Sequence, residues 1–239
     1  MSEIIKSAKI KSYEVTDGDM EQINKFTLQP LNAEDVFIFK LAICDNEIDR
    51  AFENFPLESL TKMAELFEGK PIIKDHQRTA DNQIARIYST EVVEQDGRTK
   101  TGERYAQLIA KCYMLKDEPL VKEIQAGIKK EVSVGLSIGK AICSICGTDN
   151  VHEYCSHWPG KEYDGKTCTF ELAEPNDAYE VSFVAVPCQP KAGTTKDYGG
   201  EPQKEDTKEE NKELNNELES LEAKLKNLEA FLFVESEEK

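Results

Sequence analysis

Four of the seven cysteines lie within residues 143–168, and this cluster constrains the fold more than any other feature of the sequence. An even spread over 239 residues would place fewer than one cysteine in that window. Residues 1–6 lack the apolar stretch of a secretory signal, so a disulfide framework like those of secreted domains is not expected. The cluster therefore predicts a metal site in a soluble, cytoplasmic protein.

The spacing of the cluster fits a structural zinc site. Cys143 and Cys146 form a Cys-x2-Cys pair that is followed by glycine. Cys155 and His157 form a second close pair, and two such pairs supply the four ligands of tetrahedral zinc. Cys168 competes with His157 for the fourth position. A catalytic zinc with an open position and a set of free thiols are the alternatives to this zinc knuckle.

The acidic charge is concentrated towards the C-terminus. The formal net charge is −16, and residues 201–239 hold 13 acidic and 6 basic side chains, a net of −7. A surface this negative repels phosphate backbones and anionic lipid, so neither nucleic acid nor a membrane surface is an expected partner. No apolar run approaches the ~20 residues that a membrane helix needs.

A linker and an acidic helix are predicted after the main domain. Residues 196–207 have the composition of a linker. Beyond them, in residues 208–239, leucines recur with spacings of 4, 3, 4, 3 and 4: Leu214, Leu218, Leu221, Leu225, Leu228 and Leu232. This is the a/d pattern of a short coiled coil. A single helix of this length is marginal in water, so we expect self-association or attachment to a partner; the alternative is a frayed, charged tail.

Residues 1–195 are predicted to form an α+β domain. Its core is expected to be a β-barrel or a curled sheet with two or three surrounding helices, interrupted by the zinc knuckle at 143–168. Helices are predicted at 57–68 and between Asp117 and Gly127. An Asp96-Gly97 turn is predicted to close a hairpin. Apolar and alternating runs predict the strands, at residues 36–44, 71–74, 84–93, 104–114, 131–142 and 178–187.

The strand at 131–142 has one face made only of small residues: Ser133, Gly135, Ser137 and Gly139. Such a face buries little apolar area but lets another chain come close. His76, which ends the strand at 71–74, is the only histidine outside the cysteine cluster. Because a serine hydroxyl needs a base to become a nucleophile, Ser133 and His76 are a candidate catalytic pair that requires a carboxylate to orient the imidazole.

Three segments, in this order, resemble the prohead (head maturation) proteases of tailed phages: GKPIIKDH, KKEVSVGLSIG and DAYEVSFVAVPCQPKAG. That family is distantly related to the herpesvirus assemblins, and the resemblance covers about residues 35–195. It implies a Ser-His protease on a β-barrel with surrounding helices. Ser133 matches the serine of the family's Ser-x-Gly motif, and His76 matches its histidine. Glu180 is the expected acidic member, with Asp177 as its substitute.

The chain departs from the family pattern in two places. Leu136 follows the Ser-x-Gly motif where the family usually has phenylalanine, and Ser137 is an alternative nucleophile. The cysteine-rich segment is not part of the minimal pattern. Ser182, in the last predicted strand, is interpreted as a packing residue.

The resemblance implies a serine endopeptidase that cleaves scaffold and major capsid proteins during phage head maturation. Its place would be inside the assembling prohead, in the host bacterial cytoplasm. Two alternatives belong to other functional classes. One is a non-catalytic scaffold or assembly protein that keeps the fold, the zinc knuckle and the coiled-coil tail. The other is an interaction module built around the zinc knuckle.

Overall fold

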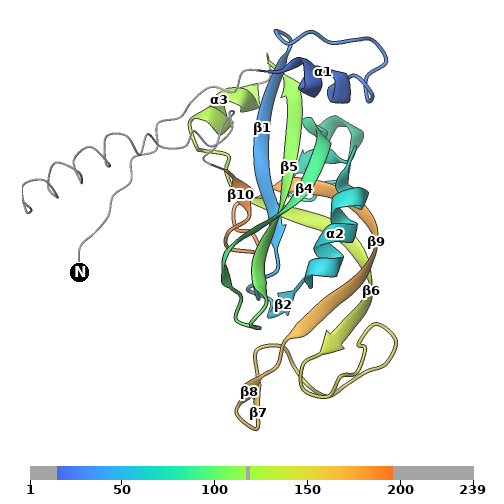
Figure 1. Ribbon diagram of the computed structural model, residues 1–239, viewed down its shortest axis with the longest axis vertical. Helices are drawn as coiled ribbons and strands as arrows, with labels where there is room; N and C mark the ends of the chain where they lie inside the picture. The colour runs from blue at the N-terminus through green and yellow to red at the C-terminus, as the bar shows by residue number, and fades with distance from the viewer. Residues whose placement is uncertain (1–14, 117–118, 196–239) are drawn as a thin grey trace, which may run out of the picture. The chain divides into compact units, whose positions relative to one another are not determined.

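The computed structural model describes residues 15–116 and 119–195 (Figure 1). These residues fall within the predicted domain, whereas the predicted linker at 196–207 and coiled-coil tail at 208–239 lie outside them. The fold is α+β, as the sequence predicts, with a mixed sheet and few helices. Among the described helices, none is both long enough and apolar enough to cross a membrane.

The elements follow one another in chain order as α1 (Asp17–Ile23), β1 (Val36–Asp45), β2 (Glu53–Asn54), α2 (Leu57–Phe67), β3 (Pro71–Lys74), a 3-10 turn (Ala80–Asn82), β4 (Ala85–Arg98), β5 (Arg104–Leu115), α3 (Pro119–Gln125), β6 (Val132–Cys143), β7 (Glu162–Tyr163), β8 (Lys166–Thr167), β9 (Phe170–Phe183) and β10 (Gly193–Thr194). The short helix α1 is not predicted by the sequence pattern. Its N-terminus is capped by Thr16, which shares a capping box with Asp19.

The main sheet is curled rather than closed. Its strands follow the order β10-β1-β5-β4-β3-β9-β2, and β6 pairs with β9 off this path. The chain around β10 meets the start of β6 through the bridge between Glu131 and Gly193 and a hydrogen bond from the Thr194 N–H to the Lys130 carbonyl at 2.8 Å. β10 is two residues long, and the described strands do not form a closed barrel. Of the two predicted arrangements, the curled sheet is the one observed.

Helix α2 covers the sheet along the predicted apolar stripe. Leu60, Met63 and Phe67 are fully buried in the main core. The helix packs against β4 and β9, as Figure 1 shows. Each such side chain contributes about 1.5–3 kcal/mol when it is removed from water.

The strands β4 and β5 form the predicted hairpin, but its turn lies at residues 99–103 instead of Asp96-Gly97. Thr99 is buried, and its Oγ1 accepts a hydrogen bond from the Glu103 backbone N at 3.2 Å. The Asp-Gly pair falls in an irregularity of the strand register. Such a pair is compatible with a bulge as well as a turn, and here it lies in the irregular stretch between Glu94 and Arg98.

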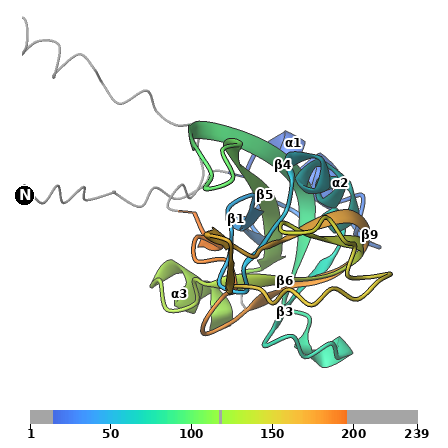
Figure 2. The same cartoon turned by 90° about the horizontal axis from the view of Figure 1, so that it is seen from below.

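The strands β6 and β9 form the part of the sheet that carries the candidate site. They lie side by side in both views (Figures 1 and 2), and their core face packs against β1. The strand β9 begins at Phe170, whereas the sequence predicts a strand from Ala178. Its first half includes Glu174 with a positive φ of 54° followed by Pro175, an irregular stretch without a strand-like pattern.

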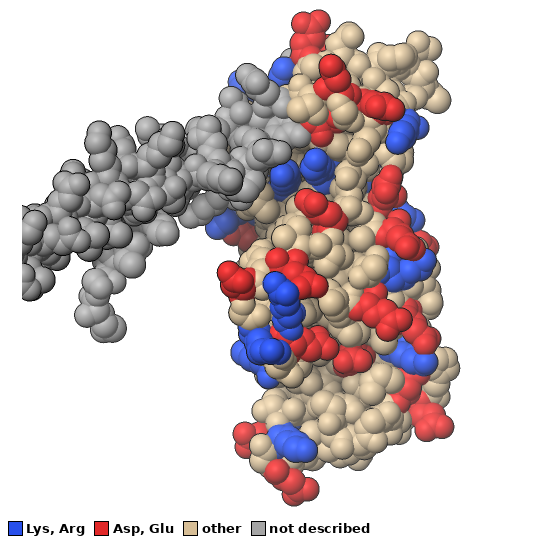
Figure 3. All heavy atoms as spheres, viewed as in Figure 1, with Lys and Arg blue, Asp and Glu red and all other residues tan. Residues whose placement is uncertain are grey.

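Charged side chains are mixed over the surface. On the face shown in Figure 3, acidic and basic groups are interspersed, so this face has no large area of one sign.

Candidate catalytic site and metal centre

His76 lies in a tight turn directly after β3. Asp75 and His76 both have positive φ, 53° and 54°, and the Gln77 N–H donates to the Lys74 carbonyl at 3.1 Å. Positive φ at both central residues is typical of a type I′ turn. This conformation is unfavourable for residues with side chains, so the surrounding contacts must hold it in place.

His76 is hydrogen-bonded to Glu180. The distance between His76 Nδ1 and Glu180 Oε1 is 2.8 Å. The Glu180 side chain is 1% exposed and the His76 side chain is 42% exposed, so a buried carboxylate orients an accessible ring. A neutral imidazole with this partner carries its proton on Nδ1, which leaves Nε2 free to accept a proton. Asp177, the alternative acid, instead pairs with Lys70 Nζ at 3.2 Å.

Ser182 connects the histidine and the glutamate. Its Oγ donates to Glu180 Oε2 at 2.6 Å and accepts from the backbone N–H of His76 at 3.0 Å. Ser182 is fully buried. It therefore fixes both the carboxylate and the strained turn, and the sequence interpretation as a packing residue misses this role. In the sequence, only the two-residue spacing between Ser182 and Glu180 indicates that their side chains lie on the same face of a strand and can bond to each other.

Ser133 lies on the same face of the sheet as this hydrogen-bonded unit. In the antiparallel register of β6 and β9, Ser133 is opposite Ser182 and Gly135 is opposite Glu180. Directly opposite residues share a face, with Cβ atoms about 4.5–5.5 Å apart. Within residues 15–116 and 119–195, the Ser133 hydroxyl has no hydrogen-bond partner. The structure thus brings Ser133, Ser182, Glu180 and His76 together.

Gly135 makes room for the Glu180 side chain. A Cβ at position 135 would lie 2.1 Å from Glu180 Oε1 and 3.0 Å from a terminal nitrogen of Arg78. Real Cβ atoms do not approach other atoms this closely. The glycine of the Ser-x-Gly motif is therefore required because the buried carboxylate crosses β6 at this position.

Ser137 is farther from the histidine along the strand pair. It is opposite Asp177, and a register shift separates Gly135 from Leu136. The His76 backbone is bound to Ser182, which faces Ser133. The register therefore places Ser133, and not Ser137, opposite the serine that binds the His76 turn.

Arg78 adds a positive charge that the sequence pattern does not identify. Its guanidinium lies over the Tyr179 ring, 4.4 Å from the ring centroid, and its Nε is 3.9 Å from Glu180 Oε1. In the sequence, only its position two residues after His76 links Arg78 to the candidate site. The cation partly balances the charge of the buried carboxylate.

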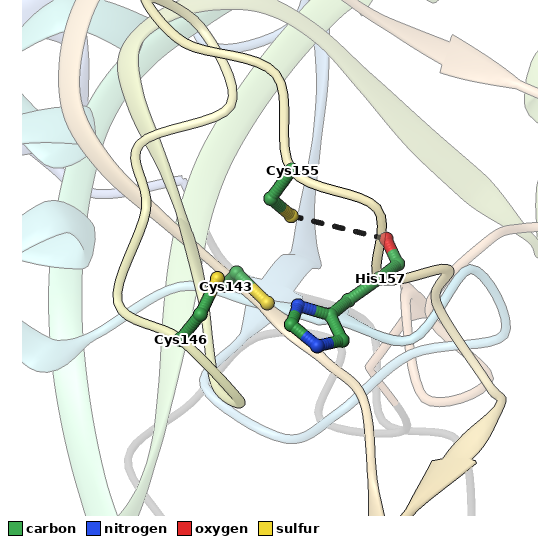
Figure 4. Close-up of side chains that lie close together, drawn as sticks. All are labelled: Cys143, Cys146, Cys155 and His157. Atoms are coloured by element: carbon green, nitrogen blue, oxygen red, sulfur yellow. Dashed lines mark hydrogen bonds between the residues drawn. The ribbon is translucent and has the colours of Figure 1, made fainter.

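A second cluster forms where β6 ends. One ligand atom from each of four side chains lies within 4.8 Å of the others, and these side chains converge in Figure 4: Cys143, Cys146, Cys155 and His157. The first pair sits on a tight turn in which the Gly147 N–H donates to the Cys143 carbonyl at 2.9 Å. Gly147 has φ of 74°, a conformation that glycine adopts without strain.

The donor atoms of this cluster fit a metal ion. His157 Nδ1 is buried and has no hydrogen-bond partner among the described residues, a costly state that a metal bond would relieve. Cys146 Sγ and Thr148 Oγ1 are hydrogen-bonded at 3.2 Å; this contact, then the Thr148 backbone and the neighbouring His157 and Cys143, lower the pKa of Cys146 to about 6. Its thiolate, the form that binds metals, is therefore favoured. These four residues can hold a metal ion.

Cys168 lies beside the four residues without completing their set. Its Sγ is 3.8 Å from Cys143 Sγ. It is fully buried, and the group of four whose ligand atoms lie within 4.8 Å of one another does not include it. His152 points elsewhere and is hydrogen-bonded to Asp149 Oδ2 at 2.6 Å. All seven cysteines are free of disulfide bonds.

Comparisons with protein-family models, with curated proteins and with solved structures found no match for this chain. The likeness to prohead proteases therefore rests on the three sequence segments alone. Chemically, the first cluster is an arrangement suited to acyl transfer by a serine. The second is a set of sulfur and nitrogen ligands suited to a metal ion.

Proposed function

We propose that this chain is a serine endopeptidase in which Ser133 is the nucleophile, His76 the general base and Glu180 the orienting carboxylate. The observation that carries this proposal is the 2.8 Å hydrogen bond between His76 Nδ1 and Glu180 Oε1, on the sheet face that Ser133 shares. The resemblance to prohead proteases suggests the substrates, which are scaffold and major capsid proteins. It also suggests the place, inside the assembling prohead in the host bacterial cytoplasm.

The proposed reaction is acyl transfer in two steps. Ser133 Oγ attacks the carbonyl carbon of a peptide bond while His76 Nε2 takes its proton. Glu180 accepts the hydrogen bond from Nδ1 and stabilises the imidazolium. The carbon–nitrogen bond then breaks as Nε2 returns the proton to the leaving amine. Water, activated by the same nitrogen, hydrolyses the acyl-enzyme and releases the serine.

The contacts around Glu180 support its role as the orienting group. Its Oε1 bonds to the ring of His76 and its Oε2 to Ser182, so the carboxylate has one fixed position. A fixed, buried carboxylate holds the imidazole in one tautomer without reorganisation during the reaction.

The Cys/His cluster is proposed to bind Zn²⁺ as a structural ion. Three thiolates and one imidazole complete a tetrahedral shell with no open position, which is the pattern of structural zinc. The unpartnered His157 Nδ1 supports this choice. The bound ion would hold the polar loop of residues 143–168, whose apolar cluster is small.

A fluorophosphonate probe tests the nucleophile without a known substrate, because it phosphonylates serines that a neighbouring base activates. We expect the probe to label the full-length protein at Ser133, as identified by peptide mass spectrometry, and to leave Ser133→Ala unlabelled. Ser137→Ala is the matched control and should be labelled like wild type. Labelling that persists in Ser133→Ala and disappears in Ser137→Ala would move the nucleophile to Ser137. A folded wild type that remains unlabelled would refute the protease proposal.

Co-expression with the neighbouring scaffold and capsid proteins tests the substrate. Wild type should yield shortened products that Ser133→Ala does not. Identical, uncleaved products from both proteins would instead support the non-catalytic assembly role.

A further inference from the structure

A cavity of about 150 Å³ lies beside β6, bordered by the end of β1, the loop that leads into β2 and the chain that follows β9. A cavity of about this size holds one benzene ring in an engineered apolar core, so it can accept one side chain. Ser133 is among its lining residues. The proposed nucleophile therefore belongs to the strand that forms one wall of the cavity.

Most of the cavity wall is apolar. Ile43, Phe55, Val134 and Leu136 contribute to it. These side chains lie on the core face of the sheet, opposite the face that carries the Ser133 hydroxyl. The cavity can therefore receive a side chain while the backbone of the same ligand passes along the edge of β6.

Two carboxylates, Asp49 and Glu53, interrupt this apolar wall. Asp49 is engaged by the protein itself: its Oδ1 accepts the N–H groups of Ala51 and Glu53, at 2.8 and 3.0 Å. Its Oδ2 accepts the Cys188 thiol at 3.0 Å. The Glu53 carboxylate, by contrast, has no hydrogen bond or ion pair in the part of the chain that the structure describes.

The position of Glu53 is unfavourable for a charged group in the free protein. Burial, and then the charge of Asp49, raise the pKa of Glu53. A half-buried carboxylate without a partner is costly to retain, and a cation in the cavity would relieve this cost.

The edge of β6 that faces away from β9 is unpaired over most of its length among the described residues. Between Ser133 and Lys140, no described strand pairs with this edge. An extended peptide that adds a strand here would place alternate side chains on the two faces of the sheet. A side chain next to the bond attacked by Ser133 can then enter the cavity.

We propose that this cavity is the primary specificity pocket and that it binds the lysine or arginine side chain of a substrate residue next to the scissile bond. The alkyl part of such a side chain matches the apolar wall, and its cationic end matches Glu53. The assignment of the cavity to a substrate side chain rests on the proposed function. The preference of the cavity for a cation does not, and it can be tested by binding alone.

The binding test uses N-acetyl-arginine methylamide and N-acetyl-lysine methylamide as probes. N-acetyl-norleucine methylamide, which has an alkyl side chain without a charge, is the control probe. Backbone NMR signals of Val134 and Leu136 report occupancy in the full-length protein. We expect saturable shifts with at least one basic probe, and affinity about tenfold weaker in Glu53→Gln, as expected for the loss of one charged hydrogen bond. Glu68→Gln, at an exposed position directly after the C-terminal end of α2, is the matched control and should bind like wild type.

Equal shifts with the norleucine probe, or undiminished binding by Glu53→Gln, would overturn the inference. Retained melting temperature in the variant excludes misfolding as the cause of any loss. Cleavage of a peptide library, mapped by mass spectrometry, tests the link to catalysis. Fluorophosphonate labelling of Ser133 combined with cleavage that ignores basic residues would reject the pocket and leave the protease intact. Absent labelling combined with selective binding of a basic probe would reject the protease and leave the cation site.

Discussion

The carboxylate of Glu180 occupies the space in which a side chain at position 135 would lie. An ideal Cβ built on Gly135 would be 2.1 Å from Glu180 Oε1. The small residue two positions after Ser133 and the acid on the neighbouring strand are therefore one geometric unit.

Gly135→Ala should displace Glu180 and destabilise the fold. Overpacking of this kind costs about 1–3 kcal/mol, and the displaced carboxylate would no longer orient His76. Thermal unfolding should show the lower stability, and fluorophosphonate labelling of Ser133 should be lost. Gly139→Ala is the control on the same strand, where the nearest atoms are 3.1 Å from the new Cβ, and its effect should be smaller. Wild-type labelling of Gly135→Ala would show that the carboxylate is not needed in this position.

Glu180→Gln should reduce kcat/KM by about 10²- to 10⁴-fold, the range expected when the acid that orients a catalytic histidine becomes an amide. His76 and Ser182 bond to different oxygens of Glu180, and in the amide one of these oxygens becomes an NH₂ group that cannot accept a hydrogen bond. Rates of fluorophosphonate labelling measure the effect without a natural substrate. Asp177→Asn is the matched control, since Asp177 pairs only with Lys70 among the described residues. A larger loss in Asp177→Asn than in Glu180→Gln would identify Asp177 as the third catalytic residue.

Purified protein should contain about one zinc ion per chain, and a chelator should lower its melting temperature because metal binding and loop folding are coupled. His157→Ala should lose most of the metal. His152→Ala should retain it, because His152 is bonded to Asp149 instead of facing the cluster. Elemental analysis of both variants, purified without chelator, measures the zinc content per chain. Full zinc content in His157→Ala together with its loss in Cys168→Ala would assign the fourth ligand to Cys168.

Glu53→Gln should stabilise the protein more at pH 7 than at pH 4. Because burial and Asp49 raise the pKa of Glu53 above its ordinary value of 4.5, the native state binds this proton more tightly than the unfolded chain. Native stability from this group is full below the ordinary value and is lost as the pH rises through the native pKa. The difference in melting temperature between the variant and wild type should therefore grow with pH. A difference that is constant from pH 4 to pH 7 would contradict this account.

Local patterns in the sequence predict much of this fold. The stripe along residues 57–67 becomes the buried face of α2, and the alternation in residues 131–142 becomes β6 with one core face and one Ser/Gly face. The Cys/His spacing also predicts a compact cluster, because its four ligands come from one loop. Each of these features depends on residues that are close in sequence.

Features that depend on distant parts of the chain are not predictable in this way. The contact of His76 with Ser182 spans 106 residues and follows from the pairing of β3 with β9. Arg78 stacks on Tyr179 for the same reason, since both positions are set by that register. The open sheet depends on which distant strands pair, since β10 pairs with β1 and has only a short contact with the chain at the start of β6. The residue pattern within one strand does not indicate which distant strand it pairs with or in which register.

The strand β6 carries the candidate nucleophile at one end and a residue of the Cys/His cluster at the other. It begins one residue before Ser133 and ends at Cys143, so these two residues are roughly 33 Å apart along an extended chain. Strands open from their ends, and a metal ion bound at Cys143 would anchor the end remote from the serine. Hydrogen exchange in the metal-free protein should therefore accelerate first near Cys143 and reach Ser133 last. A metal ion at the Cys/His cluster would then stabilise β6 along its length, while Ser182 and Glu180 on β9 set the local geometry around Ser133.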